Sequence, residues 1–451
     1  MNIIHHTPFD FPLDAHFLGE SIIIRSLIKG SQDKTHVVTS SANSVYCPSL
    51  PSSMDVAGFI ASMSLDTKVH QLPYRAGEGP HVELIRELLK EDDGPVVLNY
   101  HFPGKDLDLT KKVKAEFGND VATIVHLHCM PELLEPTYYN HSKTDKRTLK
   151  ERVEEAQVDR FIAVSHAVRT AFEYGGYIAK GEIDVVQNGV DSRLYQIYSA
   201  KEKEALRDQI KIKGDRILGY VGRMNHNKGA GTILELLRYC DQADSDVGFV
   251  FATSNGNERQ RFLSQLEGVA PNLVATDRAK VVLDISKLTG DHQQTNGMVY
   301  GHFYNQLKSE GISRSRAFGG IVTTPIQGAL DAYFHPAQSE AICLAILEAL
   351  MQGVPVIASE TGGIPELVNE SNGILTDLKS VEYKAPDAIK DAAYKANARV
   401  LFDQIGALDT LLRDRKIVSP GEIRTQALQK GLTTDRMQER TREIYQRAIG
   451  Q

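Results

Sequence analysis

The chain has 451 residues, of which 41% are hydrophobic and 24% charged, and it carries a formal net charge of −7. The length suggests two or three domains, and the composition excludes the disordered and fibrous classes. The negative charge lies in the first half: residues 1–195 hold 20 Lys and Arg against 27 Asp and Glu, and the remainder holds 31 of each. An acidic half disfavours nucleic acid and anionic lipid as partners.

Neither a membrane span nor a secretion signal is visible in the sequence. No apolar run approaches the roughly 18 residues of a spanning helix, and the start, MNIIHHTPFDF, lacks a charged region and a long apolar stretch. The cysteines lie far apart without a CxxC pair, which favours reduced thiols over disulfides or a metal site; they are Cys47, Cys129, Cys240 and Cys343. We therefore expect a cytoplasmic protein without strong membrane association.

Strands alternate with helices along the first half, which is the pattern of a parallel sheet covered on both faces. The first predicted strand, Asn2–His6, is followed by a helical run from Gly19 to Gly30 and a strand from His36. Further strands are predicted at Pro95–Tyr100, Val121–Leu127, Arg160–Val164 and Ile183–Val186, and helices at Val82–Lys90, Leu109–Phe117 and Thr148–Gln157.

The alternation restarts after a charged helical linker, Ser199–Gly214. Predicted strands are Ile217–Val221, Val247–Thr253, Ala332–Phe334 and Pro355–Ala358, and predicted helices are Gly231–Tyr239, Cys343–Met351 and Thr434–Ala448. Residues 255–328 are the least regular part. The pattern predicts an α/β protein with two doubly wound domains of similar size, joined near residue 200.

A loop after the strand Ile217–Val221 gathers two cations and several glycines. Gly222 ends the strand, Arg223 and Lys228 follow, and Gly229 opens a helix. Two cations beside free backbone N–H groups would neutralise a diphosphate, which Arg can bind through two parallel hydrogen bonds. The alternative is a solvated turn with two surface cations, because glycine-rich loops between strands and helices are common.

Two glutamates eight residues apart, Glu340 and Glu348, precede a Gly-Gly turn. We predict that Ser339 caps a helix that starts near Ala341, so that N–H groups of the first turn face an anion. Glu348, on an otherwise apolar helix, would accept hydrogen bonds from sugar hydroxyls. A core helix with glutamates at its edges would show the same spacing.

His126 and His128 lie where the strand Val121–Leu127 ends, and both point to the same face of the sheet. Open α/β sheets bind ligands at the carboxyl ends of their strands, so either imidazole could contact a substrate, and His128 lies nearer the strand end. A structural role is the alternative. Metal binding is disfavoured because no third ligand follows nearby.

Three other polar features carry weaker signals. Asp106–Asp108 and Asp244–Asp246 lie in polar, loop-like surroundings, which favours solvated turns over a metal site. His5 and His6 are interpreted as the end of the first strand.

Five ordered motifs resemble those of the retaining glycosyltransferases of family 4, which have the GT-B fold. In chain order they are RFIAVSHAVRTAF, VVQNGVD, YVGRMNHNKG, HPAQSEAICLAILEALMQGVPVIASETGGIPELV and NGIL. The resemblance implies two Rossmann-like domains that face each other across a cleft. We expect an acceptor-binding domain at 1–198, a donor-binding domain at 215–432, and a C-terminal helix at 433–451 that packs back towards the first domain.

The resemblance also implies roles for single residues. Arg223 and Lys228 would bind the donor diphosphate. Glu348 would hold the ribose and Glu340 the transferred sugar. The implied catalytic residues are His128, His126, Arg223, Lys228 and Glu340. The other implied donor-binding residues are Gly19, Gly222, Ala341, Ile342, Cys343 and Leu344. Enzymes of this family generally need no metal, so we expect no cofactor.

The sequence departs from the family pattern at three places. The first loop, residues 7–20, has one glycine where the family often has two. Ile342 and Cys343 replace the usual Phe-Gly after the first glutamate. The chain is longer than usual between Lys228 and Glu340, where an insertion would bear on specificity or assembly.

The expected activity is retaining transfer of a hexosyl unit from a UDP-, GDP- or ADP-linked sugar to the hydroxyl of a small or neutral acceptor. A sugar-nucleotide epimerase, a phosphorylase or a non-catalytic sugar-nucleotide-binding subunit are the alternatives, because one fold serves many functions. The sequence leaves open the donor base and sugar, the acceptor, the linkage and the oligomeric state.

Overall fold

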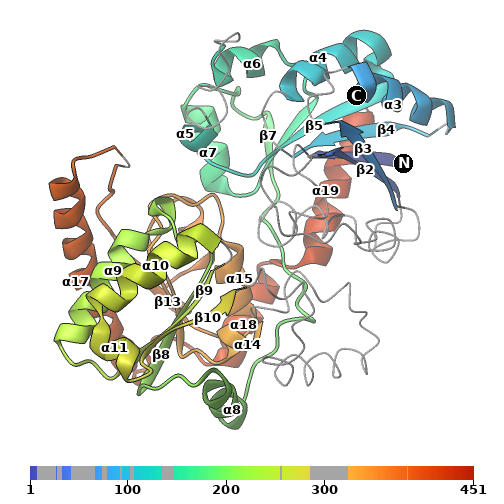
Figure 1. The fold of residues 1–451 in the computed structure, drawn as a ribbon. Coiled ribbons are helices and arrows are strands. Elements are labelled where there is room, and N and C mark those ends of the chain that lie inside the picture. The colour runs from blue at the N-terminus through green and yellow to red at the C-terminus, as the bar shows by residue number, and fades with distance from the viewer. Residues whose placement is uncertain are drawn as a thin grey trace. The chain divides into compact units, whose positions relative to one another are not determined.

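The computed structural model describes residues 1–7, 27, 33–41, 67–73, 79–91, 94–101, 106–134, 147–253, 256–284, 324–382 and 384–450. They form two compact units (Figure 1): Met1–Gly189 with Thr433–Gln451, and Val190–Leu432. The division follows Gly189, whereas the predicted first domain ends at residue 198. A Cβ atom on Gly189 would lie 2.1 Å from the carbonyl oxygen of Thr433, so the two segments of the first unit touch there.

The first unit is built on a parallel sheet with strand order β3-β2-β1-β4-β5-β6-β7. The strands are β1 Asn2–Thr7, β2 Lys34–Ser41, β3 Thr67–Pro73, β4 Val96–Tyr100, β5 Val121–Leu127, β6 Arg160–Ala163 and β7 Ile183–Val185. Every residue of β4 and β5 is buried, as expected for strands with helices on both faces. The strand order reverses between β1 and β4, which is where such sheets bind ligands.

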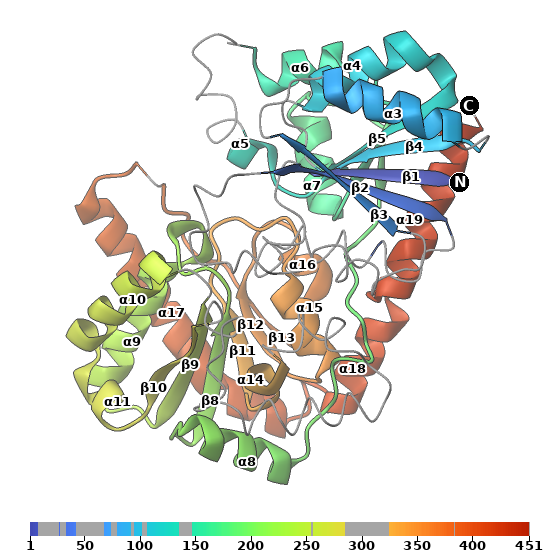
Figure 2. The same ribbon diagram turned by 45° about the vertical axis from the view of Figure 1, so that its right-hand side comes forward.

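The helices of the first unit cover both faces of its sheet. They are α3 Gly79–Glu91, α4 Asp106–Phe117, α5 Pro131–Leu134, α6 Leu149–Glu155, α7 His166–Tyr174 and α19 Thr434–Ile449, with a 3₁₀ turn η2 at Gly118–Asp120. Figure 2 shows α3 and α4 on one face and α19 on the other. Arg442 of α19 forms an ion pair with Asp33, the residue before β2, and its Nε lies 2.8 Å from Asp33 Oδ2.

The second unit has a parallel sheet with strand order β10-β9-β8-β11-β12-β13. The strands are β8 Arg216–Val221, β9 Val247–Thr253, β10 Ala279–Asp284, β11 Ala332–His335, β12 Val356–Ser359 and β13 Gly373–Thr376. Its order reverses between β8 and β11. Both sheets confirm the predicted fold class of two doubly wound α/β domains.

Helices flank both faces of the second sheet (Figure 1). They are α8 Ala200–Ile210, α9 Ala230–Gln242, α10 Gly256–Val269, α11 Pro271–Ala275, α14 Thr324–Gly328, α15 Leu344–Met351, α16 Ile364–Leu367, α17 Asp387–Arg413 and α18 Pro420–Gln429, with a 3₁₀ turn η4 at His226–Lys228. The described part of the irregular stretch 255–328 is therefore regular, with α10, α11, β10 and α14. Helices α17 and α18 were not predicted at all.

Local sequence explains where several helices begin. Each of three helices has a capping box, with Thr148, Ser199 or Ser419 as its N-cap. The side chain of the cap accepts a hydrogen bond from the backbone N–H of the glutamate three residues on, and the side chain of that glutamate accepts one from the backbone N–H of the cap.

Among the residues that the structure describes, no helix has the length and apolar character needed to cross a membrane.

Candidate functional site

The loop between β8 and α9 brings a cation to the carboxyl end of the second sheet. The side chain of Asn225 accepts a hydrogen bond from the backbone N–H of Lys228 at 3.1 Å, which closes the turn η4. Gly229 follows with φ +82°, and a Cβ atom there would lie 2.0 Å from the carbonyl oxygen of Pro336. Only glycine lets this loop approach the chain after β11, so the turn places Lys228 beside that segment.

The segment after β11 is held from the other side by the Gly-Gly turn. Gly362 has φ +52°, and a Cβ atom on it would lie 1.7 Å from the carbonyl oxygen of Glu340. The N–H of Gly363 donates to the same oxygen at 3.0 Å. The two glycines therefore hold the backbone of Glu340 in place.

Glu340 is the centre of a buried charged cluster, which we define as Lys228, His335 and Glu340. Lys228 Nζ forms an ion pair with Glu340 Oε2, and His335 Nε2 lies 3.0 Å from the same oxygen. Glu340 is 8% and His335 2% exposed. A carboxylate that accepts two cationic donors at one oxygen is held in one orientation.

The charged cluster shifts the protonation of both of its buried members. Burial alone raises the pKa of the Glu340 carboxyl, but Lys228 and His335 outweigh burial and lower it to about 2. Burial lowers the pKa of His335, whereas Cys343 and Glu340 raise it to about 9. At neutral pH Glu340 is thus a carboxylate and His335 an imidazolium.

Helix α15 begins later than predicted. Its N-cap is Cys343, which makes no side-chain capping bond, and its first residue is Leu344. The prediction that Ser339 caps this helix is wrong, because the contact of Glu340 with the Gly-Gly turn keeps the preceding residues out of the helix. Backbone N–H groups at the start of α15 still lack partners within the helix and can bind an anion.

Glu348 lies in the buried part of α15 and is 6% exposed. Gln327 Nε2 donates to Glu348 Oε2 at 3.3 Å and to the carbonyl oxygen of Ala345 at 3.1 Å. Glu348 also accepts a hydrogen bond from Tyr195, and burial together with that carboxylate raises the pKa of Tyr195 well above its usual value. The carboxylate is therefore hydrogen-bonded on a buried helix, as its position required.

The first unit carries a histidine cluster, defined as His5, His101, His126 and His128, at the carboxyl ends of β1, β4 and β5. His101 lies 2.9 Å from His5 (Nε2 to Nδ1) and 3.1 Å from His128 (Nδ1 to Nε2). Asn99 Oδ1 lies 2.9 Å from His126 Nδ1, so that nitrogen donates. Burial lowers the pKa of His5 to about 3 and that of His126 well below its usual value. These rings are neutral at pH 7.

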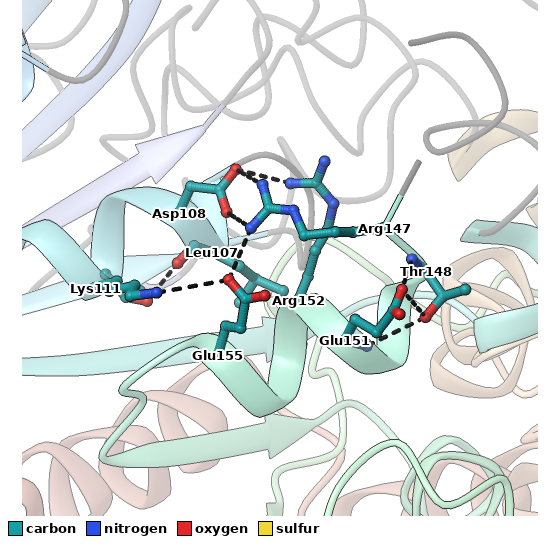
Figure 3. Close-up of polar contacts among 9 residues, drawn as sticks. Leu107, Asp108, Lys111, Arg147, Thr148, Glu151, Arg152 and Glu155 are labelled. Carbon is teal, nitrogen blue, oxygen red and sulfur yellow. Dashed lines mark hydrogen bonds and ion pairs between the residues drawn. The ribbon is translucent and has the colours of Figure 1, made fainter. Parts of the chain in front are cut away.

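Asp108 belongs to an ion-pair network rather than to a solvated turn (Figure 3). It lies in the first turn of α4, so the prediction of loop-like surroundings is wrong for this pair. Arg152 Nη1 lies 2.8 Å and Arg147 Nη1 3.0 Å from its carboxylate, and Arg147 also pairs with Glu155 at 2.9 Å. These arginines occupy the carboxylate oxygens that a metal would need. Asp244 and Asp246 pair with Arg278 at 3.0 and 3.8 Å.

The structure brings some predicted residues together and leaves others apart. Lys228 and Glu340 meet directly, and the backbone of Ala341, Ile342, Cys343 and Leu344 continues from Glu340 into α15. Arg223 is exposed in the same loop as Lys228, one residue after Gly222. Gly19 lies outside the described residues.

Sequence reasoning missed several site residues. His335 ends β11 and is followed by Pro336, so the strand-end argument used for His126 and His128 would have found it. His5 was read only as the end of a strand, and His101 directly follows β4. Gln327 and Tyr195 carry no such signal, because only packing brings them to Glu348.

Residues 326–394, which include both glutamates, match the family described as "Glycosyl transferases group 1". A GDP-mannose-dependent alpha-mannosyltransferase of Corynebacterium glutamicum is 38% identical over 73 residues, which cover 16% of this chain and 18% of that protein. One of Mycobacterium tuberculosis is 30% identical over 96 residues, 18% of this chain and 25% of that protein. The matches thus span at most a quarter of these relatives.

Solved structures resemble the chain over nearly its whole length. HepE from Anabaena in complex with UDP has a TM-score of 0.66 at 18% identity, covering 99% of this chain and 100% of that one. Sucrose-phosphate synthase from Thermosynechococcus elongatus has a TM-score of 0.66 at 15% identity, covering 100% and 99%. The chain therefore has the GT-B fold of these structures, and at such identities the likeness concerns the fold alone.

Proposed function

We propose that the protein transfers a hexosyl unit from a nucleotide-diphosphate sugar to an acceptor hydroxyl, with retention at the anomeric carbon. The observation that carries the proposal is the charged cluster. It joins a cation on a glycine-containing loop to a carboxylate in the loop between β11 and α15, at the reversal point of a parallel sheet. Glu340 and Glu348 also lie inside the segment that matches the group 1 glycosyl transferases.

Each part of the site has a partner on such a donor. The leaving nucleoside diphosphate gains negative charge as the glycosidic bond breaks, and Lys228, Arg223 and the N–H groups at the start of α15 can meet that charge. Glu340 would accept hydrogen bonds from hydroxyls of the sugar. Glu348 would accept them from the ribose, in exchange for its bond to Tyr195 or Gln327.

Retention is the outcome that the resemblance implies, and the state of Glu340 bears on the route to it. A carboxylate committed to Lys228 and His335 is a hydrogen-bond acceptor and a weak nucleophile, so a covalent glycosyl-enzyme on it is disfavoured. We infer attack on the same face from which the diphosphate leaves. The acceptor hydroxyl forms the new C–O bond, the old one breaks, and the hydroxyl proton passes to the departing phosphate oxygen.

A histidine of the histidine cluster would contact the donor sugar as a neutral group. The resemblance assigns a histidine beside the donor sugar, and His128 is the more exposed of the two candidates in the histidine cluster. A neutral imidazole can donate or accept a hydrogen bond at the sugar without repelling the positive charge that develops at the reacting carbon.

No divalent cation is needed for this chemistry, because Lys228 and Arg223 supply the positive charge. We therefore propose transfer that persists in excess chelator. The donors to test first are GDP-mannose, named for the two relatives, and UDP-glucose, found with HepE in a solved structure. The small or neutral acceptor stays a proposal drawn from the acidic first half.

The test is an acceptor screen with each donor, in chelator, with the product anomer read by NMR. Lys228→Ala should lower the rate about 100- to 1,000-fold, the loss typical of one group that stabilises developing charge. Lys201→Ala, an exposed lysine of α8, is the matched control and should leave the rate unchanged. Equal rates for both variants would contradict the site, and epimerised donor without acceptor would favour an epimerase.

A further inference from the structure

Three metal-ligating side chains converge at the charged cluster, and two of them belong to it. They are His335 at the end of β11, Glu340 in the loop that follows, and Cys343 at the N-cap of α15. One ligand atom from each lies within 4.8 Å of the other two, and all three residues are buried. Within the described ranges this is the group of three such side chains that comes closest to a coordination sphere.

The donor set suits a borderline-soft cation. Imidazole nitrogen, carboxylate oxygen and thiolate sulfur are ligands of Zn²⁺, which tolerates three protein ligands and an open fourth position. Bond lengths of about 2.3 Å to sulfur and about 2.0 Å to nitrogen or oxygen put tetrahedral ligand atoms roughly 3.3–3.6 Å apart. The present spacing would need side-chain shifts of about an ångström, well within rotamer adjustment.

The histidine is already oriented as a metal ligand would be. Tyr333 donates its hydroxyl hydrogen to the carbonyl oxygen of Val221 at 3.0 Å. The same hydroxyl lies 3.2 Å from His335 Nδ1, so it accepts the Nδ1–H bond. This leaves Nε2 to face Glu340. A ring whose other nitrogen donates to a fixed acceptor is the arrangement that metal-binding histidines use.

Charge also balances in a metal-bound state. Zn²⁺ with one carboxylate and one thiolate is neutral, which suits a buried site. Binding would release the Nε2 proton of His335 and the thiol proton of Cys343, and Lys228 would leave Glu340. The side chain of Lys228 is 21% exposed, so it can turn towards solvent when it leaves Glu340.

We propose that His335, Glu340 and Cys343 form a Zn²⁺ site that competes with the sugar-nucleotide donor. The binding of Zn²⁺ is independent of the proposed function. The competition rests on the proposed function, because Glu340 cannot bind Zn²⁺ and the hydroxyls of the sugar at once. Bound Zn²⁺ would therefore act as an inhibitor of transfer rather than as a cofactor.

The first experiment measures zinc bound per chain by equilibrium dialysis in thiol-free, chelator-free buffer. Compared with the parent, Cys343→Ala and His335→Gln should each bind one equivalent less. Cys240→Ala, which removes a buried thiol of α9 in the same unit, should bind as the parent does. Comparison by difference keeps the result independent of any further zinc bound elsewhere. Thermal melting checks that each variant is folded.

Cobalt gives a spectroscopic readout of the same site. Co²⁺ bound through Cys343 should show a thiolate-to-metal absorption band that Cys343→Ala lacks and Cys240→Ala keeps. Tyr333→Phe removes the acceptor for Nδ1–H, together with the hydrogen bond to Val221, and should weaken zinc binding about 10- to 100-fold. Full zinc stoichiometry in both ligand variants, or an unchanged cobalt band in Cys343→Ala, would overturn the site.

Competition separates this inference from the proposed function. Added Zn²⁺ should weaken the binding of a nucleotide sugar to the parent in proportion to site occupancy, and Cys343→Ala should resist that effect. Zinc binding without competition would overturn the inhibitory role and leave the metal site standing. A parent that binds zinc but no nucleotide sugar would contradict the proposed function and the inhibitory role, while the metal site would stand.

Discussion

The two units place histidines at the same topological position and give them opposite charge states. In each unit the side chains lie at the carboxyl ends of central parallel strands. Burial lowers the pKa of His5 to about 3, whereas His335 has its pKa raised to about 9 by Cys343 and Glu340 despite burial. The difference lies in the neighbours: the histidine cluster is joined by neutral imidazole and amide groups, whereas His335 lies beside Cys343 and the Glu340 carboxylate. Acidic neighbours can thus outweigh burial and keep a buried imidazole protonated.

The largest effect should come from removing that carboxylate. Glu340→Ala leaves Lys228 and His335 facing each other without their shared partner in a buried site, which typically costs about 3–5 kcal/mol. The free energy of opening of the second unit, measured by hydrogen exchange of peptides from β11 and α15, should fall by this amount. Glu204→Ala, an exposed position on α8, is the control and should change it by under about 0.5 kcal/mol. Equal effects of the two variants would contradict the charged cluster.

The pH dependence of stability should have opposite signs in the two units. The folded pKa values of His5 and His126 lie below the unfolded value of about 6.5, so the unfolded state binds more protons in acid. The first unit should lose stability as the pH falls from about 6.5 towards about 3, by up to about 1.4 kcal/mol per pH unit for each group.

His335 acts in the other direction. Its folded pKa of about 9 lies above the unfolded value, so its contribution is complete below pH 6.5 and is lost as the pH rises towards 9. Hydrogen exchange followed separately for peptides of each unit between pH 4 and pH 9 measures both slopes, after correction for the intrinsic exchange rate. Slopes of the same sign in both units would remove the distinction between the clusters.

The smallest effect should come from a neutral contact of the histidine cluster. Asn99 Nδ2 donates to the hydroxyl of Tyr445 at 2.5 Å, which links α19 to β4. Tyr445→Phe removes one uncharged hydrogen bond and should cost about 1–2 kcal/mol in the first unit. Tyr174→Phe, at a side chain that is 86% exposed, should cost nothing measurable. A loss from Tyr445→Phe as large as that from Glu340→Ala would show that charge is not what separates the two clusters.

The sequence predicted the parts of the molecule that repeat a local pattern. Apolar strands between helices gave both sheets, and Lys228 and Glu340 were recognised from glycine spacing and motif order. Strand β3 was missed because TKVHQLP is polar, and β13 because it has only four residues. Strand β10 was missed although AKVVLD contains an apolar run. Helix α17 was missed although it has 27 residues, since its apolar residues form a weak stripe.

The failures at the site come from contacts between distant residues. Ser339 looked like a helix cap, but the Gly-Gly turn binds the backbone of Glu340 and delays the helix to Leu344. The Asp106–Asp108 pair looked like a loop because its partners Arg147 and Arg152 lie about 40 residues further along the chain. Such pairings depend on tertiary packing and leave no periodic trace in the sequence.

The most direct test of the account is calorimetric titration of UDP, GDP and ADP into the metal-free protein. The account predicts that at least one of them binds the parent and the Lys201→Ala control equally. Lys228→Ala should bind it about 10- to 100-fold more weakly, the value of one charge-assisted hydrogen bond. Binding of none of the three to the parent, or equal binding to parent and Lys228→Ala, would contradict the assignment of the charged cluster as a donor site.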